Sequence, residues 1–230
     1  MKVSDENGFT PTQEQETAMK IAIIAANGRA GRLITAKAVR RGHDVTAIVR
    51  SENKTDAPST IQKDILDLTA EDLAGFEVAI DAFGTWDPEK MSLHTDTVLH
   101  LADILSGTDT RLLVVGGAGS LYVNPEHTVT VADAPDFPTD YLPTATAMAA
   151  SLAKLRARDD VRWTYLSPAA DFQADGERAG AYLLAGEGFT LNTAGESVIS
   201  YADYAIAMLD EAERTGADAH VRERISVVRR

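Results

Sequence analysis

The sequence of 230 residues contains no cysteine, which excludes disulfide bonds and metal sites built from thiolates. It also contains no apolar run close to the roughly 20 residues that a membrane-spanning helix needs. Basic residues are scarce, since 22 lysines and arginines stand against 35 acidic residues and give a net charge of −13. Such a charge repels the phosphate backbone of nucleic acid. We therefore expect a cytoplasmic protein without nucleic-acid or membrane partners.

The chain divides into two regions of different character. Residues 1–18 (MKVSDENGFTPTQEQETA) are polar, acidic and aperiodic, and we expect a disordered N-terminal extension with no role in the fold. In residues 19–230, short apolar runs rich in β-branched residues alternate with segments of helical periodicity. This alternation predicts a single α/β domain with a Rossmann-type, doubly wound parallel sheet.

The boundaries of the predicted elements follow from the apolar runs and from the glycines that interrupt them. The predicted strands cover residues 20–25, 44–49, 59–63, 78–83, 111–115, 162–166 and 224–228. The predicted helices cover residues 29–41, 88–105, 142–158 and 201–214. The last helix and strand form a short C-terminal βα extension. Residues 167–196 are glycine-rich without a regular pattern, which favours a long binding loop over a cleft.

The turn after the first predicted strand has the features of a phosphate-binding loop. Small residues stand at Ala25, Gly28 and Gly31, where the chain must reverse, approach a pyrophosphate and pack a helix on the strand. The helix that follows offers free N–H groups and a partial positive charge at its N-terminus. Asn27 is expected to take the left-handed conformation that such turns often need. The residues predicted to bind a dinucleotide are Ala25, Asn27, Gly28, Arg29, Ala30 and Gly31; a tight turn that binds nothing is the alternative.

The end of the second predicted strand distinguishes between the two nicotinamide cofactors. An acidic residue at this place bonds the adenosine ribose and favours NAD(H), whereas an arginine accommodates a 2′-phosphate. The sequence has Arg50 there and no carboxylate before Glu52. We therefore predict that NADP(H) is preferred and NAD(H) is the second choice. Arg29 is a candidate for a further contact with the 2′-phosphate, and the alternative for Arg50 is an ordinary solvated arginine.

Five motifs together resemble a known family. They are residues 20–50 (KIAIIAANGRAGRLITAKAVRRGHDVTAIVR), 63–67 (KDILD), 113–121 (LVVGGAGSL), 163–169 (WTYLSPA) and 199–205 (ISYADYA). They resemble the atypical short-chain dehydrogenases/reductases described as NADH-flavin reductase-like or NAD(P)-binding. The NmrA-like redox sensors and the biliverdin reductase B/flavin reductases are relatives of this group. The resemblance extends over residues 19–230 in the family's order.

The resemblance implies binding roles for residues that follow the predicted strands. Those expected around the adenosine half of the cofactor are Asp64 and Ile65 at the adenine, and Phe83 and Gly84 at the ribose. Those expected at the nicotinamide end are Gly116, Gly117, Ser167, Pro168 and Ala169. The family usually has glycine at the position of Ala25, so the extra methyl group is expected to weaken the approach of the pyrophosphate rather than to change the fold.

The proton-transfer pair of most short-chain dehydrogenases is missing. In that pair a lysine four residues after a tyrosine lowers the tyrosine pKa. None of the six tyrosines of this chain has a lysine at that distance. Hydride transfer to a flavin or a quinone depends less on a proton donor in the protein, because the product takes its proton from solvent and the cofactor supplies the chemistry.

We therefore predict an NAD(P)H-dependent oxidoreductase that reduces a flavin, a quinone or a similar planar acceptor, with FMN or FAD as candidate substrates. Ser120 and Tyr141 are the catalytic candidates, although a loop hydroxyl and a packing ring explain them equally well. Trp86 and Phe83 are candidates for an apolar wall against a planar ring. A non-catalytic NAD(P)-responsive regulator stays open, as does a sugar-nucleotide epimerase. The five histidines show no metal-ligand spacing, so no metal is expected; the protein is expected to be a monomer or a homodimer.

Overall fold

A computed structural model describes residues 18–230, so the extension expected over residues 1–18 lies outside the described residues except for Ala18. Its main sheet consists of β1 (Lys20–Ile24), β2 (Asp44–Val49), β3 (Ser59–Gln62), β4 (Val78–Asp81), β5 (Arg111–Val115), β6 (Arg162–Ser167), β8 (Tyr182–Ala185) and β10 (Glu223–Arg229). The strands lie in the order β3-β2-β1-β4-β5-β6-β10-β8. Every neighbouring pair is parallel except β10 and β8.

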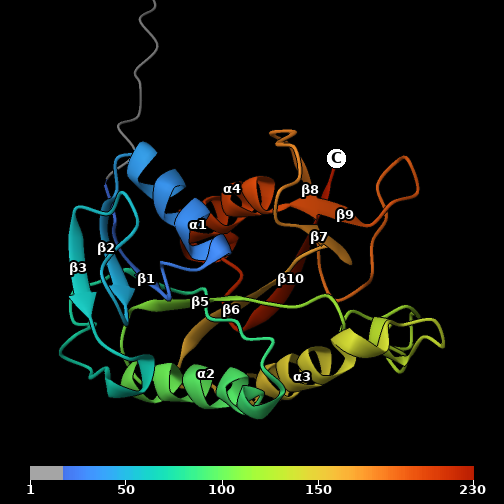
Figure 1. Cartoon of the computed structure of the whole chain (residues 1–230), viewed down its shortest axis with the longest axis horizontal. Coiled ribbons are helices and arrows are strands. Elements are labelled where there is room, and N and C mark those ends of the chain that lie inside the picture. Colours follow the sequence, from blue (N-terminus) through green and yellow to red (C-terminus); the bar gives the residue numbers. More distant parts are fainter. Residues whose placement is uncertain (1–17) are drawn as a thin grey trace, which may run out of the picture.

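Within residues 18–230, four α-helices cover the sheet, two on each face. They are α1 (Arg29–Arg40), α2 (Leu93–Ile104), α3 (Leu142–Arg156) and α4 (Tyr201–Ala212). Helices α1 and α4 lie together on one face and α2 and α3 on the other (Figure 1). The predicted doubly wound Rossmann-type architecture is confirmed. No helix in residues 18–230 has the length and the apolar character needed to cross a membrane.

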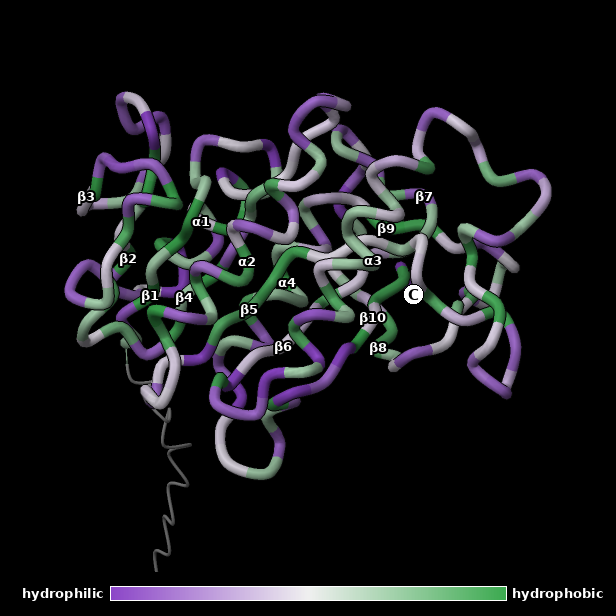
Figure 2. Tube along the Cα trace, turned by 90° about the horizontal axis from the view of Figure 1, so that it is seen from below, coloured by the Kyte–Doolittle hydropathy of each residue, from purple (hydrophilic) through white to green (hydrophobic). Residues whose placement is uncertain are grey.

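Alternate residues of the central strands face the two helical layers, so both faces of the sheet are apolar. Ile21 and Ile23 of β1 belong to the core beneath α1 and α4, whereas Ala22 and Ile24 belong to the core beneath α2 and α3. The hydrophobic colour in Figure 2 follows strands such as β5 and β10, whereas much of the hydrophilic colour lies in peripheral loops.

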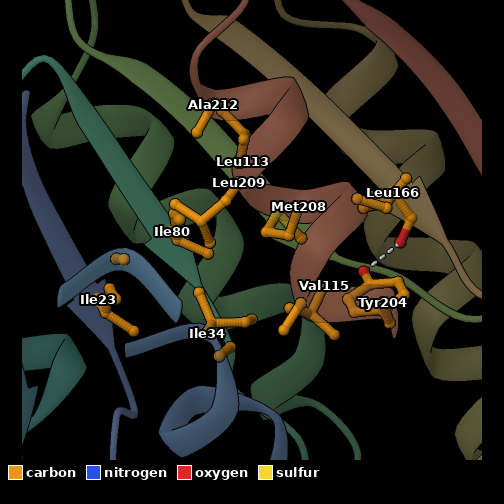
Figure 3. Close-up of a cluster of buried hydrophobic side chains, with 14 of the residues drawn as sticks. Ile23, Ile34, Ile80, Leu113, Val115, Leu166, Tyr204, Met208, Leu209 and Ala212 are labelled. Carbon is orange, nitrogen blue, oxygen red and sulfur yellow. Dashed lines mark hydrogen bonds between the residues drawn. The ribbon is translucent and has the colours of Figure 1, made fainter. Parts of the chain in front are cut away.

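Helix α4 is tied to the sheet by both packing and a hydrogen bond. Figure 3 shows Met208 and Leu209 of this helix against Ile80 and other apolar side chains of the sheet. The buried Tyr204 hydroxyl donates to the Leu166 carbonyl oxygen of β6 at 2.7 Å. The first turn of α4 is therefore fixed next to the carboxyl end of β6.

The register of the strands aligns their carboxyl ends at one edge of the sheet. Ile24 of β1 is opposite both Ile48 of β2 and Asp81 of β4. Asp81 in turn is opposite Val114 of β5. The loops that follow these strands consequently meet at one edge, which is where open α/β sheets bind ligands.

Two predicted segments differ from the structure by more than one or two residues at their ends. The helix predicted from residue 88 begins at Leu93, because Asp87 caps a separate 3-10 turn at Pro88–Lys90 by accepting the Glu89 N–H. The binding loop predicted over residues 167–196 contains β8 and also β7 (Asp171–Gln173), which pairs with β9 (Val198–Ser200). The prediction of an irregular loop was therefore wrong for these segments, whose short strands depend on distant partners.

Candidate functional site

The loop between β1 and α1 turns at an alanine. Ala25 has a φ of +56°, in the left-handed region that favours glycine, and its carbonyl oxygen accepts the Gly28 N–H at 2.9 Å. The left-handed residue of this turn is therefore Ala25, and the expectation for Asn27 was wrong. The Asn27 amide instead joins two loops: it donates to the Glu52 carbonyl oxygen at 2.9 Å and accepts the Lys54 N–H at 2.8 Å.

The two glycines of this loop stand where a side chain has little or no room. A Cβ on Gly31 would lie 2.6 Å from the Ala25 carbonyl oxygen and 2.9 Å from the Ala26 Cα. A Cβ on Gly28 would lie 3.2 Å from the same Ala25 oxygen. Helix α1 therefore packs directly on the backbone of the turn, as the spacing of the small residues predicts.

The N-terminus of α1 is suited to an anion. Gly28 is its N-cap, no side chain caps the helix, and its first turn carries no acidic residue. Arg29 is exposed at the first position of the helix. Unpaired N–H groups and the helix dipole favour negative charge at such an end. These features fit the pyrophosphate of a dinucleotide.

A first cavity of about 240 Å³ lies beside this loop, at the ends of β1, β2 and β4. Most of the residues predicted for the phosphate loop and the adenosine half line it: Ala25, Asn27, Gly28, Arg50, Asp64, Ile65, Phe83 and Gly84. Arg29, Ala30 and Gly31 do not line it but form the turn of α1 that follows Gly28. The structure thus brings together residues as far apart in the sequence as Ala25 and Gly84.

Arg50 has the position that the cofactor prediction requires. Its side chain is 74% exposed, and its Nη1 atom lies 3.8 Å from a carboxylate oxygen of Asp64. Lys63 also lines the first cavity, and its Nζ atom forms an ion pair with a carboxylate oxygen of Asp72 at 2.7 Å. Because the contact of Arg50 with Asp64 is long and solvated, it is weak, and the guanidinium is free to turn toward a phosphate.

Sequence reasoning missed Asp81 at the end of β4. Its carboxylate is 2% exposed and accepts the Phe83 N–H at 3.0 Å, which fixes the turn that lines the first cavity. Burial raises the pKa of Asp81 to about 6. A polar residue within an otherwise apolar strand (VAID) is the signal that could have identified it.

A second cavity of about 290 Å³ lies at the ends of β5 and β6. Of the residues predicted for the nicotinamide end, Gly116, Gly117, Pro168 and Ala169 line it. A Cβ on Gly116 would lie 2.2 Å from the Tyr165 ring, and one on Gly117 would lie 2.9 Å from the Met148 sulfur. These two glycines therefore allow the loop after β5 to pack closely on β6 and α3.

Ser167 lies deeper than the second cavity. It is fully buried at the end of β6, it is not among the residues that line the cavity, and its hydroxyl oxygen has no hydrogen-bond partner within the described residues. The role that the family resemblance implies for Ser167 stays a prediction.

Aromatic side chains form much of the wall of the second cavity. Trp86 and Tyr141 are 66% and 53% exposed, and their rings meet edge to face with centroids 5.5 Å apart. Phe172 and Tyr201 lie on the same cavity with ring centroids 3.9 Å apart. The sequence suggested Trp86 and Tyr141 but not the other two, whose segments are far away in the chain. Walls of this kind suit a planar ring system.

The other catalytic candidate, Ser120, lies outside this cavity. Its hydroxyl oxygen accepts a hydrogen bond at 3.3 Å from the guanidinium of Arg224, a buried residue of β10. Arg224 is also paired with Glu187. The structure thus gives Ser120 a contact with Arg224, next to Gly119 of the cavity wall, and its catalytic role stays a prediction. Within residues 18–230, no three histidine, aspartate or glutamate side chains are grouped as metal ligands would be.

Comparisons with known proteins agree with this geometry. A family model described as NAD(P)H-binding matches residues 25–212. The uncharacterized protein YwnB of Bacillus subtilis (strain 168) is 46% identical over 213 residues, which are 91% of this chain and 98% of YwnB. The structure of SP1627 from Streptococcus pneumoniae TIGR4, named a "putative NADH-flavin reductase", is 51% identical with a TM-score of 0.89 and covers 93% of this chain and 100% of SP1627.

A protein named as a different kind of enzyme is also similar. The structure of a "putative epimerase" from Bacteroides thetaiotaomicron is 31% identical with a TM-score of 0.79, and covers 92% of this chain and 97% of that one. The shared fold is therefore compatible with more than one reaction. The family model and the name of SP1627 both refer to a reduced nicotinamide cofactor. The chain belongs to the NAD(P)H-binding family, among the atypical short-chain dehydrogenases/reductases.

Proposed function

We propose that this protein is an NAD(P)H-dependent reductase that transfers hydride to a planar acceptor such as a flavin or a quinone. The observation that supports this proposal most directly is the aromatic second cavity at the ends of β5 and β6. Strand β5 is the direct neighbour of β4, whose end lies at the first cavity together with the ends of β1 and β2. Bound across both cavities, a reduced nicotinamide cofactor would supply the hydride.

The residues of this chain have separate tasks in the proposed reaction. The N–H groups at the start of α1 bind the pyrophosphate, and Arg50 binds the 2′-phosphate, which makes NADP(H) the preferred cofactor. Asp81 holds the turn at Phe83 against the adenosine half. Trp86 and Tyr141 provide a face on which the acceptor ring stacks.

The second cavity offers no paired proton donor of the tyrosine–lysine type. Tyr141 and Tyr201 line it, but no lysine or arginine within residues 18–230 does so. An acceptor that takes its second proton from solvent suits this lining better than an alcohol or a ketone does. This chemistry favours the reductase over an epimerase, which needs an acid–base pair at the substrate.

The oxidation of NADPH, followed at its near-ultraviolet absorbance, tests the proposal. The acceptors are riboflavin and a simple soluble naphthoquinone, each with and without protein. We expect acceptor-dependent consumption of NADPH that saturates with the acceptor concentration. The double variant Trp86→Ala/Tyr141→Ala should consume NADPH more slowly than the unaltered protein does. Tight NADPH binding without consumption with either acceptor would instead identify a non-catalytic, cofactor-responsive regulator.

A further inference from the structure

The two cavities differ in charge. The first is lined by two cationic side chains, Arg50 and Lys63, and by one carboxylate, that of Asp64. The second contains no lysine, arginine or histidine among its lining residues, as far as residues 18–230 are concerned, and its one charged side chain is Asp171. Proteins normally bind the phosphate groups of a ligand with arginine or lysine side chains or with the N–H groups at a helix N-terminus. The acceptor cavity has no such cation in its lining.

The chain around the mouth of the second cavity is acidic over long stretches. Residues 112–153 contain four acidic residues, Glu126, Asp133, Asp136 and Asp140, and no lysine or arginine. Residues 163–177 contain three acidic residues, Asp171, Asp175 and Glu177, and again no lysine or arginine. Both segments supply residues to the cavity wall.

Three of these carboxylates lie at or beside residues of the wall. Asp136 precedes Phe137 and Asp140 precedes Tyr141, and both aromatic residues line the cavity. All three of Asp136, Asp140 and Asp171 are exposed. Consecutive Cα atoms are about 3.8 Å apart, so the backbones of Asp136 and Asp140 lie directly beside residues of the wall.

Two neighbouring groups complete the electrostatic setting. Hydrogen bonds from the Thr130 N–H and hydroxyl hold the pKa of Asp133 below its ordinary value, so this carboxylate is ionised at neutral pH. Arg29 acts electrostatically on Tyr201, but it belongs to the start of α1, where the pyrophosphate is its natural partner. A bound dinucleotide adds further negative charge, which makes the acceptor cavity still less favourable to an anion.

We infer that the acceptor of this protein is a planar ring system without phosphate groups, neutral or cationic, such as a quinone or riboflavin, and that FMN and FAD are poor substrates. This inference rests on the proposed reductase function. Each turnover moves one hydride from NADPH and one proton from water to the acceptor, which leaves in its dihydro form together with NADP⁺. Aromatic stacking binds the ring. The carboxylates of Asp136, Asp140 and Asp171, the rim carboxylates, repel the phosphorylated forms.

Riboflavin and FMN provide a matched test, because they share one redox ring and differ in the phosphate group. We expect kcat/KM with NADPH to be about tenfold or more higher for riboflavin than for FMN at low ionic strength. The ratio should fall as NaCl is added, because salt screens the repulsion between the rim carboxylates and the phosphate. Asp140→Lys should raise kcat/KM for FMN and leave that for riboflavin nearly unchanged.

Asp218→Lys is the control, since it makes the same change of charge on an exposed residue between α4 and β10, outside both cavities. It should leave the ratio of kcat/KM for riboflavin to kcat/KM for FMN unchanged. Thermal melts should show that both variants are folded. Equal or better use of FMN by the unaltered protein at low salt overturns the inference and leaves the reductase function standing. No consumption of NADPH with riboflavin, FMN or the naphthoquinone overturns the reductase function and this inference with it.

Discussion

Gly31 lies so close to Ala25 that a Cβ on Gly31 would approach the Ala25 carbonyl oxygen to 2.6 Å. Backbone atoms on both sides of this contact leave no flexible group to move away. The packing of α1 on the turn therefore depends on the absence of a side chain at this position. The same contact fixes where the first N–H groups of α1 point.

Gly31→Val should abolish the binding of NADPH and of NADH. The branched side chain would push α1 away from the turn, which costs about 1–3 kcal/mol of stability and displaces the N–H groups that bind the pyrophosphate. Cofactor titration followed by fluorescence, with a thermal melt of each variant, measures both effects. Gly188→Ala is the matched control, because a Cβ there meets nothing within 4 Å. Normal binding by folded Gly31→Val protein would mean that the dinucleotide binds elsewhere.

Ala25→Gly should stabilise the protein, in contrast to most alanine-to-glycine changes. Ala25 has a φ of +56°, which costs an L-residue roughly 1–2 kcal/mol, and the added flexibility of glycine in the unfolded chain offsets part of the gain. We expect a net gain of about 0.5–1 kcal/mol in urea unfolding. Ala150→Gly, at an exposed position within α3, should instead lose about 1 kcal/mol. A similar loss in both variants would refute the assignment of strain to Ala25.

Arg50→Ala should remove most of the preference for NADP(H) over NAD(H). A charged hydrogen bond contributes about 1.5–3 kcal/mol, so the affinity for NADPH should fall by roughly 10- to 150-fold while that for NADH changes little. Calorimetric titration of both cofactors gives the two dissociation constants. Arg40→Ala, on the exposed last turn of α1, should change neither. If the unaltered protein binds the two cofactors equally, Arg50 has no role in selecting them.

The pH dependence of stability should reveal Asp81. Burial raises the pKa of Asp81 to about 6, whereas an unfolded aspartate has a pKa of about 3.9. The folded state therefore binds this proton more tightly, so the contribution of Asp81 to stability falls as the pH rises from about 4 through about 6 and stays low above that. His94 and Tyr165 face the same small void, and burial lowers the pKa of His94 and raises that of Tyr165 to about 12.

Comparison with Asp81→Asn separates Asp81 from these neighbours. The free energy of unfolding of the variant relative to the unaltered protein should rise by about 2–3 kcal/mol between pH 4 and pH 7. Urea unfolding at several pH values measures this difference, and Asp218→Asn, at an exposed position, should show no such change. Curves for the unaltered protein and Asp81→Asn that run parallel over this range would show that the Asp81 pKa is not raised.

Local patterns were sufficient to predict the central fold. Strand β2 and strand β5 have the predicted boundaries, because each is a short, largely apolar run. Strands β7, β8 and β9 were not predicted from the local pattern. Their pairing depends on partners elsewhere in the chain, such as β10 for β8, and local periodicity does not report such partners.

The same distinction applies to the candidate site. The glycine spacing of the phosphate loop encodes a local backbone requirement, and so it could be recognised in the sequence. The contact of Ser120 could not be predicted, because the Arg224 guanidinium that donates to its hydroxyl oxygen is 104 residues away in the chain. Phe172 and Tyr201 reach the second cavity only because β7 pairs with β9 directly before α4. Positions of this kind are decided by tertiary pairing rather than by sequence spacing.

The hydrogen bonds of Asn27 have a consequence for protein engineering. Its side chain joins the phosphate loop to the backbone at Glu52 and Lys54, in the loop that follows Arg50. The two loops are therefore one exchangeable unit. A cofactor-specificity graft that changed the backbone path of residues 50–54 would break this bridge, whereas a graft that keeps this path and Asn27 would retain it.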